Sequence, residues 1–99
     1  MAALVSHPFV EQVLDWGRFE DRVYVVTEYF PGIALASFLD NGYRLTASQV
    51  IKLGFELASG LSAIHDQGLS HGDVSPANVI LGYNGYPKLS AIYLTNALI

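Results

Sequence analysis

The segment from residue 46 to residue 68 constrains the fold most, because its sequence predicts one long helix with a single apolar face. Thr46 and Gln49 are spaced as a capping box, in which each side chain accepts a backbone N–H of the first turn. Gly68 is placed to end the helix. The apolar residues that recur at helical spacing, and that we expect to be buried, are Val50, Leu53, Leu57, Leu61 and Ile64, with Phe55 and Ala58 widening the stripe.

Strand-forming segments lie on both sides of this helix. Residues 9–19 and 22–30 predict a β-hairpin around the polar turn Glu20-Asp21, and Pro31-Gly32 ends its second strand. An isolated hairpin is marginally stable in water, so it is expected to need further strands. Residues 34–39 predict a short helix. Residues 79–81 and 86–90 predict a second hairpin around Asn84-Gly85. The fold class that follows is α+β.

The loop between the long helix and the second hairpin carries the residues with the most chemistry. It reads His-Gly-Asp-Val-Ser-Pro-Ala-Asn and places Asp73 five residues before Asn78. A carboxylate in such a loop can accept a proton from a hydroxyl nucleophile, and a carboxamide oxygen can ligate Mg²⁺. The alternative is that both side chains only satisfy backbone groups of the loop. His71 is expected to brace the loop rather than to act as a base.

This loop resembles the catalytic loop of the eukaryotic-type protein kinases, whose pattern is His-Arg-Asp-Leu-x-x-x-Asn. Its His-Gly-Asp form is also similar to that of the small-molecule kinases of the aminoglycoside phosphotransferase type. The order of the expected elements matches the middle of a protein kinase over nearly the whole chain. The resemblance implies a partial protein-kinase-like fold. Residues 1–30 would form the last hairpin of the N-lobe and the hinge, and residues 31–99 the start of the helical C-lobe with the catalytic-loop hairpin.

The same resemblance implies roles for individual residues. Asp73 would be the catalytic base, and Asn78 a catalytic residue that ligates Mg²⁺. Thr27 stands at the gatekeeper position. Ser75 replaces the Lys that in Ser/Thr kinases contacts the transferring phosphate, and it is assigned to the ATP site. The hinge, whose backbone would hydrogen-bond the adenine of ATP, is Glu28, Tyr29 and Phe30.

Other positions depart from the kinase pattern. Gly72 replaces the Arg that precedes the catalytic Asp, and Ala91 stands where the Asp of the metal-binding Asp-Phe-Gly triplet is expected. Alanine offers no oxygen to Mg²⁺, and residues 79–99 contain no Asp or Glu. The Gly-rich loop and the phosphate-pairing Lys of the N-lobe are also absent from the chain. Because phosphoryl transfer depends on positioning and on neutralising phosphate charge, the chain is expected to be a very poor kinase.

Three functional interpretations stay open at this point. The first is a pseudokinase-like module with a binding or regulatory role and weak or no phosphoryl transfer from ATP. The second is part of an active ATP-dependent Ser/Thr protein kinase or small-molecule phosphotransferase. The third is a fragment that does not fold stably alone, which the unpaired hairpin and the high apolar content suggest.

Composition bears on partners and location. Hydrophobic residues make up 52% of the 99 residues and charged residues 14%, against roughly 25% charged in an average domain. This imbalance predicts apolar surface for a protein partner, a missing N-lobe or a second copy of the chain. Five scattered basic residues and a net charge of −4 disfavour nucleic-acid binding. The apolar runs are too short for a membrane span, the start does not resemble a signal peptide, and we expect a cytoplasmic protein.

Overall fold

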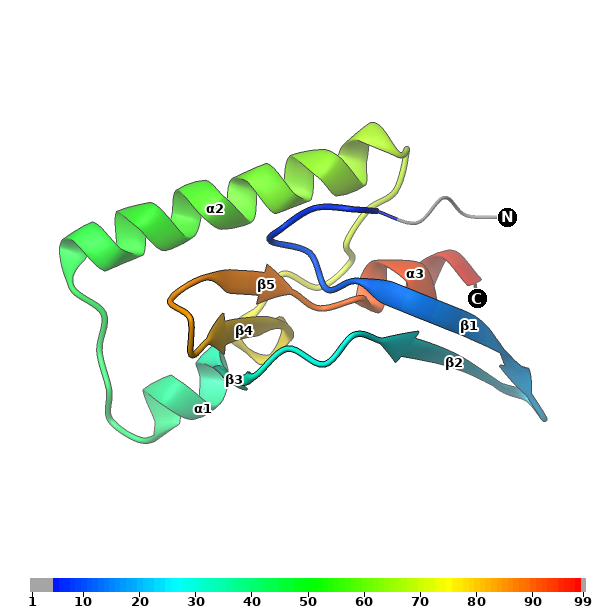
Figure 1. The fold of residues 1–99 in the computed structure, drawn as a ribbon, viewed down its shortest axis with the longest axis horizontal. Coiled ribbons are helices and arrows are strands. Elements are labelled where there is room, and N and C mark those ends of the chain that lie inside the picture. The colour runs from blue at the N-terminus through cyan, green and yellow to red at the C-terminus, as the bar shows by residue number, and fades with distance from the viewer. Residues whose placement is uncertain (1–4, 99) are drawn as a thin grey trace.

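The computed structural model describes residues 5–98, and its centre is a small antiparallel sheet covered by a long helix. Figure 1 shows the helix α2 (Ala47–Asp66) lying along one side of the sheet formed by β3 (Gly32–Ala34), β4 (Val79–Gly82) and β5 (Pro87–Leu89). The strand order is β3-β4-β5. A separate hairpin of β1 (Val13–Phe19) and β2 (Arg22–Thr27) extends away from this sheet, at the end of the molecule opposite to the first turns of α2. The expected α+β class is confirmed.

The β1–β2 hairpin forms around the expected turn, but both strands are shorter than predicted: the first begins at Val13 instead of residue 9. Trp16 pairs with Val25 across the ladder, and both pack against the buried core. The prediction that the second strand reaches residue 30 is wrong, because pairing ends where Thr27 meets Val13. Residues 28–30 therefore form an extended connection between the two sheets.

Strand β3 is missing from the sequence prediction. The Pro31-Gly32 pair does not end the extended chain there, because Gly32 opens a new strand opposite Gly82. A side chain at residue 32 would collide with the backbone carbonyl of Leu81, so only glycine fits this pairing. The short helix that follows, α1 (Leu35–Asp40), begins one residue later than expected.

The N-terminal segment adds one further rung to this sheet. Val10 forms a parallel bridge with Leu89, flanked by hydrogen bonds from the Glu11 N–H to the Leu89 carbonyl and from the Leu89 N–H to the Phe9 carbonyl, both 2.8 Å. Residues far apart in the sequence thus meet at β5. Gly60 of α2 permits this packing, because a Cβ there would lie 3.0 Å from the Phe9 carbonyl oxygen.

Helix α2 begins and ends as the sequence predicts. The Gln49 N–H donates to Thr46 Oγ1 (3.2 Å) and the Thr46 N–H donates to Gln49 Oε1 (2.8 Å), which completes the capping box. Gly68 has a φ of +72°, in the left-handed region, and its N–H donates to the His65 carbonyl at 2.8 Å. The predicted apolar face is only partly buried. Its buried and half-buried members are Leu53, Leu57, Leu61 and Ile64.

Three residues assigned to that face are exposed instead. Val50 is 53% and Phe55 79% exposed, and Ala58 is also exposed. Two of the three follow from helical spacing: Phe55 and Ala58 project from other sides of α2 than Leu57, Leu61 and Ile64. Val50 lies in the first turn, which extends beyond the sheet. The prediction that these three residues belong to the buried stripe is therefore wrong.

The last described segment forms a helix that the sequence analysis did not predict. Helix α3 (Ile92–Leu98) follows Ala91 directly, in the region compared above with the metal-binding triplet. It inserts Tyr93 and Leu94 into the core, where both are fully buried beside Ile64, Leu89 and Val10. Within residues 5–98, no helix combines the length and the apolar character that a membrane span requires.

Candidate phosphotransfer site

The loop between α2 and β4 brings three of the proposed site residues together. The side-chain amide of Asn78 donates to both the backbone oxygen (3.1 Å) and the Oδ2 atom (2.9 Å) of Asp73, and it lies 3.4 Å from Ser75 Oγ. The short 3₁₀ turn η1 (Pro76–Asn78) makes this possible by folding Asn78 back toward the residues before it. Gly72, with a φ of 94°, supplies a backbone conformation that other residues rarely adopt.

His71 connects this loop to the end of β5 through hydrogen bonds, in the structural role expected from the sequence. It is 2% exposed, with Nε2 3.1 Å from the Ser90 carbonyl oxygen and Nδ1 3.2 Å from the Asp73 N–H. A carbonyl only accepts and an N–H only donates, so these partners require a proton on Nε2 and a bare Nδ1. Burial lowers the pKa of His71, opposed by the Ser90 carbonyl and by the Asp73 charge. The ring is therefore held neutral.

The oxygen atoms near the expected metal position are engaged by protein groups. The Asn78 Oδ1 atom accepts a hydrogen bond of 3.2 Å from the Ser90 hydroxyl. Ala91 has no side-chain oxygen; its carbonyl accepts the Leu94 N–H at 3.1 Å, and its N–H donates to Glu11 Oε1 at 2.9 Å. Among residues 5–98, no group of three or more His, Cys, Asp and Glu side chains could hold a metal ion. The donor set therefore does not fit Mg²⁺ in the arrangement that the kinase resemblance implies.

Glu11 is the residue that sequence reasoning missed at this site. Residues 79–99 contain no acid that could replace the lost Asp, whereas Glu11 comes from the other end of the chain. It reaches Ala91 because the bridge between Val10 and Leu89 places the N-terminal segment beside β5. No local pattern signals such a contact, since it depends on tertiary pairing.

The residues compared with a kinase hinge lie apart from this loop. Pro31, next to Phe30, accepts a hydrogen bond of 3.1 Å from the Tyr83 N–H, just beyond the Gly82 end of β4. The catalytic-type loop enters the same strand at its other end, Val79. Tyr29 is 85% exposed. The structure thus groups Asp73, Ser75 and Asn78, whereas Phe30 leads into Pro31 at the opposite end of β4. Thr27 and Glu28 lie beside Val13 and Gln12 of the N-terminal half.

Two groups of the hinge segment already have partners. The Glu28 N–H donates to the Gln12 carbonyl at 2.9 Å, next to the last pair of the β1–β2 ladder. The Phe30 ring lies below the Lys88 ammonium, 5.1 Å from its centroid. These contacts fix the path of the segment between the hairpin and the sheet.

The chain is similar in sequence to known serine/threonine-protein kinases. The probable serine/threonine-protein kinase PknB of Lactococcus lactis is 29% identical over 96 residues, which are 97% of this chain and 15% of that protein. The serine/threonine-protein kinase SSK22 of Saccharomyces cerevisiae is 36% identical over 86 residues, 86% of this chain and 6% of its own length. The chain therefore spans only a small part of these relatives.

A solved structure and a family description also match this chain. A solved structure titled "PpkA-294 apo form" superposes with a TM-score of 0.75 at 24% identity, covering 88% of this chain and 31% of that one. At this identity the likeness shows the fold alone. The family description "Protein kinase domain" matches residues 1–92. The chain therefore belongs to the protein kinase family.

Proposed function

We propose that this chain is a pseudokinase-like part of a Ser/Thr-kinase-like domain, with a binding or regulatory role and weak or no phosphoryl transfer from ATP. The observation that carries the proposal is at Ala91. Its N–H is bound by Glu11, and the neighbouring Ser90 hydroxyl occupies the amide oxygen of Asn78. Both positions from which a kinase would hold Mg²⁺ thus either lack a side-chain oxygen or have it already hydrogen-bonded, so phosphate charge would stay unneutralised.

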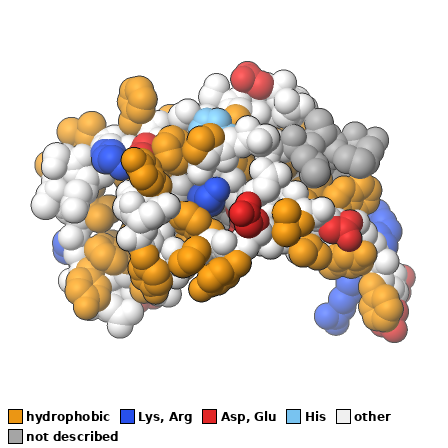
Figure 2. Space-filling model, viewed as in Figure 1, with side chains coloured by type: hydrophobic (Ala, Val, Ile, Leu, Met, Phe, Trp, Pro, Cys, Tyr) orange, Lys and Arg blue, Asp and Glu red, His pale blue; other side chains and the backbone are white. Residues whose placement is uncertain are grey.

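A binding role agrees with the surface of the molecule. Figure 2 shows apolar side chains spread over much of the visible face. Large apolar residues that are more than half exposed include Leu14 and Phe19 on the hairpin and Ile51 and Phe55 on α2. Apolar surface of this extent supports contact with a protein partner or with further parts of a kinase domain.

One observation favours the alternative of an active kinase. Asp73 is exposed, and Asn78 holds its Oδ2 atom, so its carboxylate is oriented and open to a hydroxyl substrate. In that case Asp73 is the base, and Thr27, the residues 28–30 and Ser75 contact ATP. Family kinship supports this assignment through the Ser/Thr kinases PknB and SSK22.

Nucleotide titration and turnover separate the two functions. We expect the purified chain to show no Mg²⁺-dependent transfer of labelled phosphate from ATP to a mixed protein substrate, and no Mg²⁺-dependent change in thermal stability with ATP. The informative variant is Asp73→Asn, matched by Asp66→Asn at an exposed site on α2. Robust turnover that is lost in the first variant and kept in the second would establish the active kinase instead.

A further inference from the structure

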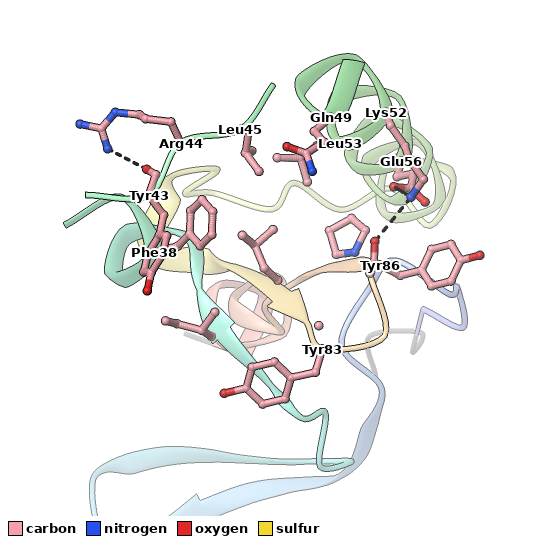
Figure 3. Close-up of a pocket in the computed structure, with 15 residues that line it drawn as sticks. Phe38, Tyr43, Arg44, Leu45, Gln49, Lys52, Leu53, Glu56, Tyr83 and Tyr86 are labelled. Atoms are coloured by element: carbon pink, nitrogen blue, oxygen red, sulfur yellow. Dashed lines mark hydrogen bonds and ion pairs between the residues drawn. The ribbon is translucent and has the colours of Figure 1, made fainter. Parts of the chain in front are cut away.

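A cavity separate from the catalytic-type loop lies between α1, the first half of α2 and the β4–β5 hairpin. Its volume is about 520 Å³, within the range of ~300–1,000 Å³ that is usual for ligand sites. Figure 3 shows it as a hollow with side chains from these elements on several sides. None of Asp73, Ser75, Asn78 and the hinge residues lines it. The cavity is thus separate from the catalytic-type loop, and a ligand bound there would specify the binding role proposed above.

The cavity has an apolar interior and an aromatic rim. Its interior is lined mainly by Ile33, Phe38, Leu45, Leu53, Leu81 and Pro87. Three tyrosines around it are exposed: Tyr43 by 61%, Tyr83 by 78% and Tyr86 by 50%. Single exposed aromatic residues are ordinary, but a group of them around one apolar hollow is typical of surfaces that bind other proteins. Tyrosine suits such sites because its ring packs while its hydroxyl stays in water.

The charges beside the cavity do not cancel. Glu56 is paired with Lys52 at 2.9 Å, and the Lys52 ammonium also lies 4.6 Å from the centroid of the Tyr86 ring. Arg44 donates only to backbone carbonyls, those of Leu39 (3.1 Å) and Tyr43 (2.7 Å), and within residues 5–98 it forms no ion pair. Its guanidinium is therefore held in place with its positive charge uncompensated.

Gln49 supplies a second hydrogen-bond donor beside the cavity, which like Arg44 favours a ligand with acceptor groups. Gln49 uses its side-chain oxygen to accept the Thr46 N–H, so its amide nitrogen is the group left for the cavity, and Figure 3 shows this side chain above the hollow. Groups that donate hydrogen bonds or carry positive charge thus exceed those that accept. The complementary ligand is apolar in its centre and acidic at its edge.

We propose that this cavity docks an acidic peptide segment of another protein, which inserts two neighbouring large apolar side chains and places a carboxylate at Arg44. A peptide fits better than a small metabolite, because the tyrosine rim extends the contact area beyond the hollow. The charged group also lies at the edge, where a flanking residue of a peptide would reach it. Recognition of this kind combines a buried anchor with a charged contact that sets the partner.

The direct test uses the 99-residue chain and two labelled probe peptides, Gly-Glu-Glu-Leu-Trp-Glu-Gly and its counterpart with Lys in place of each Glu. We expect the acidic peptide to bind about tenfold more tightly by fluorescence anisotropy, since one charge-assisted contact is worth roughly this factor. The difference should shrink as salt is raised. The amide NMR signals of Gly82 and Gly85, which line the cavity, should shift on titration.

Matched variants locate the two parts of the interaction. Arg44→Gln should remove most of the preference for the acidic peptide, whereas Arg22→Gln on β2 should leave it unchanged. Tyr83→Ala should weaken both peptides, whereas Phe19→Ala, which also removes an exposed ring, should weaken neither. NMR spectra of each variant show whether it is folded.

Several results would overturn the proposal. Equal affinity for the acidic and basic peptides, binding of neither at millimolar concentration, or NMR shifts remote from Gly82 and Gly85 would each contradict it. So would tighter binding of naphthalene-2-carboxylate than of the acidic peptide, which would indicate a small-molecule site. A dimer in analytical ultracentrifugation that Tyr83→Ala dissociates would assign the cavity to a second copy of the chain.

Discussion

At the scale of single residues, the neutral imidazole of His71 links stability to pH. Burial holds its pKa below the ordinary 6.5, so the folded chain binds this proton less readily than the unfolded chain. The resulting stabilisation is complete above pH 6.5 and is lost as the pH falls below this value. We therefore expect the free energy of unfolding, from urea titrations, to decrease between about pH 7.5 and about pH 5.5.

Replacement of His71 tests this linkage. His71→Gln should lower the free energy of unfolding by about 1–3 kcal/mol near neutral pH, because it breaks the contacts with Ser90 and Asp73, and should flatten the pH dependence. His65→Gln, at an exposed site near the end of α2, is the control and should change neither. An unaltered pH slope in His71→Gln would contradict the assignment.

The contact between Glu11 and Ala91 predicts a coupled pair of substitutions. Ala91 is 6% exposed, so Ala91→Asp would place a second carboxylate beside that of Glu11 in a poorly solvated position. We expect a loss of about 2 kcal/mol in the free energy of unfolding. Glu11→Gln in the same chain should recover at least half of this loss. A double-mutant cycle by urea unfolding measures the coupling, and simple additivity would show that the two carboxylates do not interact.

The site could be predicted from the sequence only as far as its residues are neighbours in the chain. The approach of Asp73, Ser75 and Asn78 follows from their spacing in one loop, and the structure shows it. The engagement of the Asn78 amide by Ser90 and of Ala91 by Glu11 could not be predicted, because it depends on how β5 and the N-terminal segment pair. The catalytic and nucleotide-binding roles themselves stay predictions.

At the scale of elements, the end of α2 rests on the left-handed backbone of Gly68. Its φ of +72° penalises any side chain, so Gly68→Ala should lower the free energy of unfolding by about 1 kcal/mol. Gly54 is the matched control: it lies inside the same helix with open space around it, and Gly54→Ala should instead stabilise by about 0.5–1 kcal/mol. Thermal and urea unfolding of both variants check the opposite signs. Equal effects would contradict the cap.

The elements that could be predicted are those determined by local sequence. Helix α2 carries both of its caps within its own sequence, and the Asn84-Gly85 pair marks the turn of the β4–β5 hairpin. Strand β3 has only three residues and exists through its pairing with β4, so no periodicity could show it. Helix α3 was missed because an apolar run such as Ile92 to Leu94 fits a strand or a helix equally well. The exposure of Phe55 follows from helical spacing, which places it on the side of α2 opposite Leu57 and Ile64.

At the scale of the whole molecule, one core joins the hairpin, the sheet and two helices. Leu89, Ile64 and Tyr93 are fully buried in it, and Trp16 packs against it from the hairpin. The chain should therefore unfold as one unit, with Trp16 fluorescence and the far-ultraviolet circular dichroism of the helices changing at the same urea concentration. Two separated transitions would show that the hairpin and the sheet are independent.

A substitution that creates a cavity in that core should shift the Trp16 fluorescence transition and the circular dichroism transition equally. Leu89→Ala should lower the free energy of unfolding by about 2–5 kcal/mol and move both transitions together, because Leu89 is fully buried where β5 meets α2 and the segment around Val10. Leu14→Ala, at a site 62% exposed on β1, should move neither by more than about 0.5 kcal/mol. A non-cooperative transition in the unsubstituted chain would favour the interpretation of a fragment that does not fold stably alone.

The parallel bridge between Val10 and Leu89 has a consequence for the order in which the molecule folds. The bridge closes a loop that contains most of the described residues, and the entropy of that closure must be lost before the contact contributes anything. Helix α2 and the β4–β5 hairpin form from near neighbours and can precede it. During synthesis the segment around Val10 emerges before β5 and has no partner in this sheet until β5 has been made. Refolding should therefore show the helix signal before the protection of the Glu11 and Leu89 amides from hydrogen exchange.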